Sequence, residues 1–176
     1  MWKRPGCTLT KEDFDILRRM LEEHQDHDEA MTSLLRQKLE TAQVVCKADM
    51  PDNVVTIDSR ISFRLGNGMP ETRIISRDRS GGSVSYFLPI TTMRGLALLG
   101  LAEGQTAAIS RNSSLVEILQ VTAIHYQPER TERLREAEEA IHPGLRHAET
   151  SREADHVVGR GRVSFPEGDD PGPSAA

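Results

Sequence analysis

The chain has 176 residues, a formal net charge of −5 at pH 7, 37% hydrophobic residues and 4% aromatic residues. This length predicts one domain of ordinary size with an additional segment. The negative charge argues against sequence-independent binding to DNA, and the scarcity of aromatic rings argues against a stacking surface for single strands. The two cysteines form no CxxC pair, which argues against a zinc site or a disulfide scaffold.

The N-terminal sequence "MWKRPGCTLT" has a basic start without an apolar segment, so we expect no signal peptide. No apolar run approaches the ~20 residues that a membrane helix needs. We therefore expect a cytoplasmic protein with no membrane contact. Residues 1–9 are predicted to be a flexible N-terminus.

Two amphipathic helices are predicted, over residues 10–24 and 30–46, because apolar side chains recur at helical spacing in both. A short polar joint connects them, which predicts an antiparallel hairpin, a short coiled coil, over residues 10–49. The segment "HQDHDEA" (24–30) forms the tip of this hairpin.

After Pro51 the apolar residues alternate with a period of two, which is typical of strands. The predicted strands cover residues 60–65, 71–76, 83–89, 106–110 and 115–126. A short buried helix is predicted at 93–100, between the third and fourth of these strands. An antiparallel β meander with one embedded helix makes residues 50–128 an α+β domain.

A charged helix is predicted over residues 129–147, where few apolar residues fall along one side. Residues 148–176 are rich in glycine, proline and charge, which predicts a disordered tail. The fold class is therefore α+β: a short N-terminal helical hairpin, an antiparallel β-sheet domain with one short helix, then the charged helix and the tail.

Three segments resemble one family: "MPDNVVTIDSRISFR", "GLALLGLAEGQ" and "VTAIHYQPE". They are similar to the regulator of nucleoside diphosphate kinase (Rnk) family and, through it, to the C-terminal domain of the GreA/GreB transcription factors. The likeness covers about residues 10–130, and the order of elements agrees. The resemblance implies an FKBP-like domain and docking on bacterial RNA polymerase beside the secondary channel.

The chain departs from the family pattern at "LPITTMRGLALLG", where Leu88 precedes Pro89 and residues are inserted after Ile90. The resemblance places this segment on the polymerase-contacting surface of the family. Pro89, Ile90 and Thr91 are therefore the candidate partner-binding residues of the β domain.

The tip carries Asp26, Asp28 and Glu29, and the resemblance relates the Asp26–Glu29 spacing to the acidic pair of Gre factors. In that family, two carboxylates hold Mg²⁺ in the polymerase active site for transcript cleavage. A helix of ~15 residues spans only ~22 Å, which stops short of the active site. The remaining alternatives are a solvated acidic turn and a fingertip that contacts basic polymerase surface.

No other motif indicates a catalytic residue, a metal site or a cofactor. His24 and His27 lie close in sequence, but the other histidines are scattered and supply no recognisable ligand spacing. Arg60, Arg64 and Arg73 face away from the apolar positions of their strands. They form either a basic stripe for acidic polymerase residues or solvated strand faces.

These observations predict a non-enzymatic transcription regulator that binds the RNA polymerase core as a monomer. We expect only indirect contact with nucleic acid, through the transcription complex, and no small-molecule substrate. One alternative is a Gre-type elongation factor that stimulates transcript cleavage with its acidic tip. Another is a stand-alone protein-interaction module.

Overall fold

A computed structural model describes four stretches of the chain: residues 6–23, 29–77, 86–112 and 115–141. The chain divides into two units, Met1–Glu138 and Glu139–Ala176. The description below concerns the first unit together with residues 139–141, which end the last helix of the described chain. The disordered tail predicted for 148–176 lies outside the described residues.

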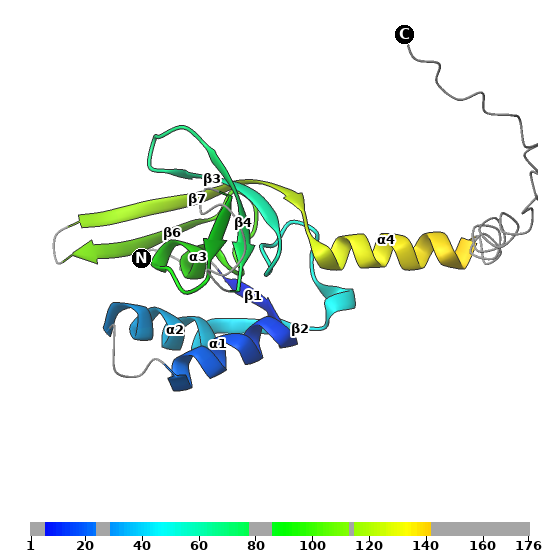
Figure 1. Cartoon of the computed structure of the whole chain (residues 1–176), viewed down its shortest axis with the longest axis horizontal. Helices are drawn as coiled ribbons and strands as arrows, with labels where there is room; N and C mark the ends of the chain where they lie inside the picture. The colour runs from blue at the N-terminus through cyan, green and yellow to red at the C-terminus, as the bar shows by residue number, and fades with distance from the viewer. Residues whose placement is uncertain (1–5, 24–28, 78–85, 113–114, 142–176) are drawn as a thin grey trace, which may run out of the picture. The chain divides into compact units, whose positions relative to one another are not determined.

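The N-terminal part consists of β1 (Cys7–Thr10), α1 (Lys11–Glu23), α2 (Glu29–Thr41) and β2 (Ala42–Val45), followed by a 3₁₀ turn at Lys47–Asp49. The helices α1 and α2 lie side by side (Figure 1). β1 pairs with β2 in parallel. Thr10 caps α1, because its hydroxyl accepts a hydrogen bond from the Asp13 N–H at 2.9 Å. The predicted pair of N-terminal helices is confirmed.

Two boundaries predicted for this region are wrong. The flexible start predicted for residues 1–9 is wrong from Cys7 onward, because β1 begins there and Leu9 is fully buried in the core. Residues 1–5 lie outside the described residues. The helix predicted over 30–46 ends at Thr41. The residues that follow form β2 instead, because they pair with β1, a partner far away in the sequence.

Five strands form one sheet in the order β5-β4-β3-β7-β6. Their bounds are β3 (Arg60–Leu65), β4 (Glu71–Ser76), β5 (Phe87–Pro89), β6 (Thr106–Asn112) and β7 (Leu115–Tyr126). Three of the four pairings are antiparallel, but β5 lies parallel to β4. The predicted meander is therefore wrong at this edge, because a tight hairpin turn cannot join parallel strands.

Two more helices complete the described chain, α3 (Met93–Leu98) and α4 (Pro128–Ile141). α3 lies where a short buried helix was predicted, and α4 lies where a charged helix was predicted. Leu134 and Ile141 of α4 are 56% and 71% exposed. Within the described stretches, no helix has the length and apolar character needed to cross a membrane.

One hydrophobic core joins the helices to the sheet. The alternation along β3 places Ile61 and Phe63 inward, where they are 0% and 2% exposed. Leu17 of α1 and Leu35 of α2 are fully buried in the same cluster. Helices at the N-terminus followed by a five-stranded sheet confirm the predicted α+β class, and the shared core ties the helices to the sheet.

Candidate partner-binding surfaces

The hairpin tip is only partly placed by the structure. Glu29 is the first residue of α2 and is exposed. Asp26 and Asp28 lie outside the described residues. The same holds for His24 and His27. In the part of the chain that is described, no three His, Cys, Asp or Glu side chains gather as a metal site would require. The contact role of the tip stays a prediction.

The second predicted contact surface follows β5, where the chain bends toward α3. Pro89 and Thr91 are half-buried. Ile90 is fully buried, and its N–H donates to the Ser76 carbonyl at 2.8 Å. Ile90 is therefore wrong as a contact residue, because its side chain packs into the core. Pro89 and Thr91 remain as candidates on this surface.

Thr92 and Gly95 hold this bend in place. The Thr92 hydroxyl donates to the Pro89 carbonyl at 2.7 Å and accepts from the Gly95 N–H at 3.1 Å. A Cβ at Gly95 would lie 2.1 Å from the Pro89 carbonyl oxygen, so only glycine allows this approach. Thr91 Oγ1 is buried with no hydrogen-bond partner among the described residues. Pro89 and the first turn of α3 are thus fixed relative to each other.

A buried lysine attaches α2 to the end of α3. Lys38 is 6% exposed, and its ammonium donates to the Leu99 carbonyl at 2.5 Å and lies 3.8 Å from Cys7 Sγ. Burial lowers the pKa of Lys38 and raises the pKa of the Cys7 thiol. Both shifts oppose an ion pair between the two groups, and the hydrogen bond to the Leu99 carbonyl compensates part of the cost of burying Lys38 Nζ.

Two buried carboxyl groups lie close to this contact. We call the region of Cys7, Asp13, Lys38 and Glu129 the joint. Asp13 of α1 is 4% exposed and Glu129 of α4 is 7% exposed. Glu129 Oε2 accepts a hydrogen bond from the Thr56 hydroxyl at 2.7 Å. Asp13 Oδ2 has no hydrogen-bond partner within the described stretches. Burial, reinforced by the charge of Glu129, raises the pKa of Asp13 to about 7.

The structure brings Ser62 and His125 together, a contact that sequence reasoning missed. Ser62 Oγ lies 2.7 Å from His125 Nε2 and 2.7 Å from Thr72 Oγ1. Nucleophilic catalysis also requires a group that orients the histidine. No carboxylate of the described chain hydrogen-bonds to His125. The three side chains link neighbouring strands across the sheet face, as polar cross-strand contacts do.

The three arginines predicted to face outward differ in their contacts. Arg64 Nε donates to Gln120 Oε1 at 2.8 Å. Arg73 forms an ion pair with Glu71 at 2.8 Å. Arg60 is exposed, and its side chain makes no hydrogen bond or ion pair within the described stretches. Arg60 and Arg64 keep charges that no carboxylate of the described chain offsets, because Gln120 is neutral. Arg73 is offset by Glu71 and, as the register partner of Ile61, lies on the opposite face of the sheet from Arg60. A single stripe of all three arginines is therefore not formed.

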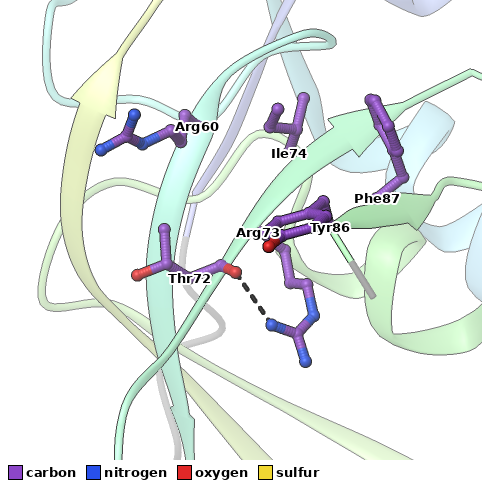
Figure 2. A pocket seen from close by; sticks show the side chains of 6 residues that line it. All are labelled: Arg60, Thr72, Arg73, Ile74, Tyr86 and Phe87. Atoms are coloured by element: carbon purple, nitrogen blue, oxygen red, sulfur yellow. Dashed lines mark hydrogen bonds between the residues drawn. The ribbon is translucent and has the colours of Figure 1, made fainter. Parts of the chain in front are cut away.

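Two of these arginines line a pocket of about 600 Å³, which we call the sheet pocket. Its walls come from β3, β4 and the chain entering β5: Arg60, Thr72, Arg73, Ile74, Tyr86 and Phe87. Figure 2 shows Tyr86 near Arg73, whose guanidinium donates to the Thr72 carbonyl at 2.9 Å. This volume lies within the usual range for small-molecule sites.

Sequence reasoning missed the sheet pocket and the buried charges of the joint. One signal for Lys38 was present, because Met31, Leu35 and Lys38 follow the i, i+4, i+7 spacing of one buried helix face. No local signal marked the sheet pocket. Tyr86 joins Arg60 and Arg73 there only through strand pairing between distant segments.

Comparisons with known proteins support the resemblance seen in the sequence, although no family model matches the chain. The regulator of nucleoside diphosphate kinase of Escherichia coli K12 is 28% identical over 127 residues, which are 72% of this chain and 93% of that protein. The Shigella flexneri protein of the same name gives the same values of 28%, 72% and 93%.

A solved structure shares the fold. The GreA/GreB elongation factor from Nitrosomonas europaea has a TM-score of 0.55 at 22% identity, covering 70% of this chain and 100% of that one. The chain therefore has a GreA/GreB-like fold. Its resemblance to the regulator of nucleoside diphosphate kinase, predicted from three sequence segments, is confirmed.

Proposed function

We propose that this chain is a non-enzymatic transcription regulator that binds core RNA polymerase beside the secondary channel. The observation that carries the proposal is the similarity to the regulator of nucleoside diphosphate kinase over 93% of that protein's length. The GreA/GreB-like fold adds support. We take the sheet unit to be FKBP-like and the protein to act as a cytoplasmic monomer.

Two surfaces make the contact in this proposal. Pro89 and Thr91 present a fixed bend, because Thr92 and Gly95 hold Pro89 against α3. Such a preformed surface loses little conformational entropy on binding. The acidic tip includes Glu29, the first residue of α2. Its charge steers the hairpin toward basic polymerase surface.

A Gre-type cleavage factor is the second candidate. It would need Asp26 and Glu29 to reach the polymerase active site with a bound Mg²⁺ ion. α1 and α2 have 13 residues each. At ~1.5 Å per residue, a helix of this length spans about 20 Å. So short a hairpin favours the regulator, which needs contact only at the channel mouth.

A stand-alone interaction module is the third candidate. The name of the Escherichia coli relative suggests nucleoside diphosphate kinase as the partner of such a module. This candidate requires no polymerase contact, so it is separated from the first by a single binding measurement.

The test is displacement of labelled GreB from core RNA polymerase by the purified full chain. We expect displacement, weakened by the double change Pro89→Ala and Thr91→Ala. Thr106→Ala, an exposed threonine on the opposite edge of the sheet, is the matched control and should displace like the wild type.

Other results would reject the proposal. An absence of displacement at high micromolar concentration, with capture of nucleoside diphosphate kinase, would favour the interaction module. Transcript cleavage in backtracked complexes that disappears in the Asp26→Ala variant would favour the Gre-type factor.

A further inference from the structure

We propose that the outer face of the sheet binds an acidic amphipathic helix of a partner protein. This face is turned away from the core and is formed by side chains of β3, β6 and β7: Arg60, Arg64, Ala108, Val116, Ile118 and Gln120. The proposal goes beyond the two contact surfaces of the proposed function and does not depend on them.

The strand register fixes which side chains share the outer face. Phe63 lies opposite Val121 in the β3–β7 pairing, and both point into the core, at 2% and 0% exposure. Successive side chains point to opposite faces of a sheet. Arg64 and its register partner Gln120 therefore point outward, where Arg64 Nε donates to Gln120 Oε1 at 2.8 Å. Ile118, two residues before Gln120, lies on the same face. The helices α1, α2 and α3 share the core with the other face (Figure 1).

The start of β7 reverses the polarity expected for a sheet face in water. The solvated face of an antiparallel sheet is normally polar, and the apolar side chains lie on the buried face. Here Val116 and Ile118 point outward and are 64% and 53% exposed. Glu117 between them points inward, where it forms an ion pair with Arg94 of α3 at 3.0 Å. Ala108, the β6 partner of Ile118, is also exposed. The outer face therefore has an apolar strip that is left open to solvent.

Two positive charges lie beside this apolar strip. Arg60 and Arg64 are exposed, and no carboxylate of the described chain offsets either charge. Both lie on β3, the strand that pairs with β7. Arginine binds a carboxylate through two parallel hydrogen bonds, which makes acidic side chains its natural partners. A segment that fits the outer face therefore presents apolar side chains to Val116 and Ile118 and carboxylates to the two arginines.

The backbone of the partner segment has to satisfy its own hydrogen bonds, which selects a helix. A segment that lies on a sheet face, rather than along its edge, receives no hydrogen bonds from the backbone of the sheet. A helix pairs its N–H and C=O groups within one segment. A helix with side chains is about 10–12 Å wide, and neighbouring strands lie ~4.8 Å apart. One helix therefore reaches from the apolar strip on β6 and β7 to the arginines on β3.

The composition of the outer face favours a protein over a nucleic-acid strand. A nucleic-acid strand is held by basic side chains that follow its phosphates and by aromatic rings beneath its bases. Val116 and Ile118 contribute neither a charge nor a ring to such contacts. The net charge of −5 also opposes the approach of a polyanion.

Titration of the isotope-labelled full chain with synthetic peptides, followed by nuclear magnetic resonance, tests the proposal. The acidic peptide has ~18 residues, long enough to form a helix, with one leucine stripe flanked by glutamates and with alanines elsewhere. In the basic control peptide, lysine replaces every glutamate. We expect the acidic peptide to shift the amide signals of β3, β6 and β7 and to bind at least about tenfold more tightly than the basic peptide, because like charges repel at the arginines. No saturable shift at millimolar acidic peptide overturns the proposal.

Three further results would also overturn the proposal. Equal affinity for the two peptides would mean that the arginines do not select the partner. Tighter binding of a single-stranded oligothymidylate to the same strands would indicate a nucleic-acid site. Signals of the outer face that change when the free chain is diluted would indicate that a second copy of the chain covers this face.

Variants locate the contact on the outer face. The double change Arg60→Gln and Arg64→Gln removes both charges. The double change Val116→Thr and Ile118→Thr removes the apolar strip and keeps β-branched side chains, which suit a strand. Each pair should weaken binding of the acidic peptide by about tenfold or more. All four side chains are exposed, so the fold should persist.

A matched control removes two positive charges from other elements. It carries Arg36→Gln in α2 and Arg135→Gln in α4, both exposed, and should bind the acidic peptide like the wild type. Equal losses in this control and in the Arg60 and Arg64 pair would contradict a specific surface. The peptide titration contains no polymerase and the displacement of GreB contains no peptide, so this proposal and the proposed function fail independently.

Discussion

The joint beneath the hairpin and the inner face of the sheet belong to one core, yet their compositions differ. The joint buries Asp13, Lys38 and Glu129, each less than a tenth exposed at 4%, 6% and 7%. The inner face of the sheet around Ile61 and Phe63 is apolar. Burying a charge costs several kcal/mol unless it is compensated, whereas burying apolar surface is favourable. The joint is therefore the part of the unit whose stability depends on proton concentration.

The two regions also differ in how they tolerate change. The bend between the sheet and α3 is fixed by close contact of backbone atoms, as at Gly95 and Pro89. The joint is fixed by polar side chains, and among them Asp13 has a pKa raised to about 7. A steric change should therefore act at every pH, and a change of charge only within a limited pH range.

The largest effect is expected from Gly95→Ala. The new Cβ would lie 2.1 Å from the Pro89 carbonyl oxygen, which is backbone and cannot rotate away. Overpacking of this kind costs about 3 kcal/mol of unfolding free energy. Urea unfolding measures it, and the loss should be the same at pH 5 and pH 8. Gly6→Ala is the control, because a Cβ there meets no atom within 4 Å. Equal stability of the two variants would mean that the bend relaxes easily.

A slightly smaller effect is expected from Asp13→Asn, which should remove a pH dependence of the unfolding free energy. The folded pKa of Asp13 is about 7 against an ordinary value of 3.8, so the folded chain holds a proton that the unfolded chain has lost. This contribution is fully present below pH 3.8 and is lost as pH rises through about 7. The wild type should lose roughly 2.6 kcal/mol between pH 5 and pH 8, because the folded pKa lies about two units above pH 5 and each unit is worth 1.36 kcal/mol.

The asparagine keeps an acceptor for the hydrogen bond from the Ile57 N–H but carries no charge. The unfolding free energy of the Asp13→Asn variant should therefore be constant between pH 5 and pH 8. Glu129 and Glu12 are the other acids that act on Asp13, and both remain in the variant. Asp15→Asn, an exposed acid of the same helix, should keep the wild-type slope. If the stability of the wild type is constant from pH 5 to pH 8, the pKa of Asp13 is not raised in the folded chain and this prediction is wrong.

Periodicity predicted the sheet side of this comparison well. The alternation of Ile61 and Phe63 with Arg60 and Arg64 follows directly from strand geometry, and the observed burial agrees. The core leucines of the hairpin, such as Leu17 and Leu35, follow from helical spacing in the same way. These patterns are local, so one sequence is enough to detect them.

The features that escaped prediction depend on distant partners. β1 and β2 pair across both helices, and β5 joins β4 in parallel, so neither pairing is encoded in a local turn. Lys38 is buried because the Leu99 carbonyl lies 2.5 Å away, a contact between residues 61 positions apart. Ile90 was misplaced on the surface for a similar reason, since the sequence does not show which side of a bend meets the core.

The smallest effect on stability is expected at the tip. The triple change Asp26→Asn, Asp28→Asn and Glu29→Gln should alter the unfolding free energy by less than about 0.5 kcal/mol, as surface substitutions usually do. Glu29 is exposed, and the core residues of the hairpin, Leu17 and Leu35, are untouched. Binding to polymerase should weaken modestly through slower association, because charges at the rim of an interface mainly steer the encounter.

Salt and a charge-matched control distinguish steering by the tip from a general effect of net charge. Contacts between exposed charges are screened over about 8 Å at physiological ionic strength, so the association rates of variant and wild type should converge as salt rises. The control changes three exposed acids of α4: Glu132→Gln, Glu136→Gln and Glu138→Gln. It removes the same charge from a distant part of the sequence and should associate like the wild type. If both triple variants slow association equally, the tip is a solvated turn and the contact depends on the bend at Pro89.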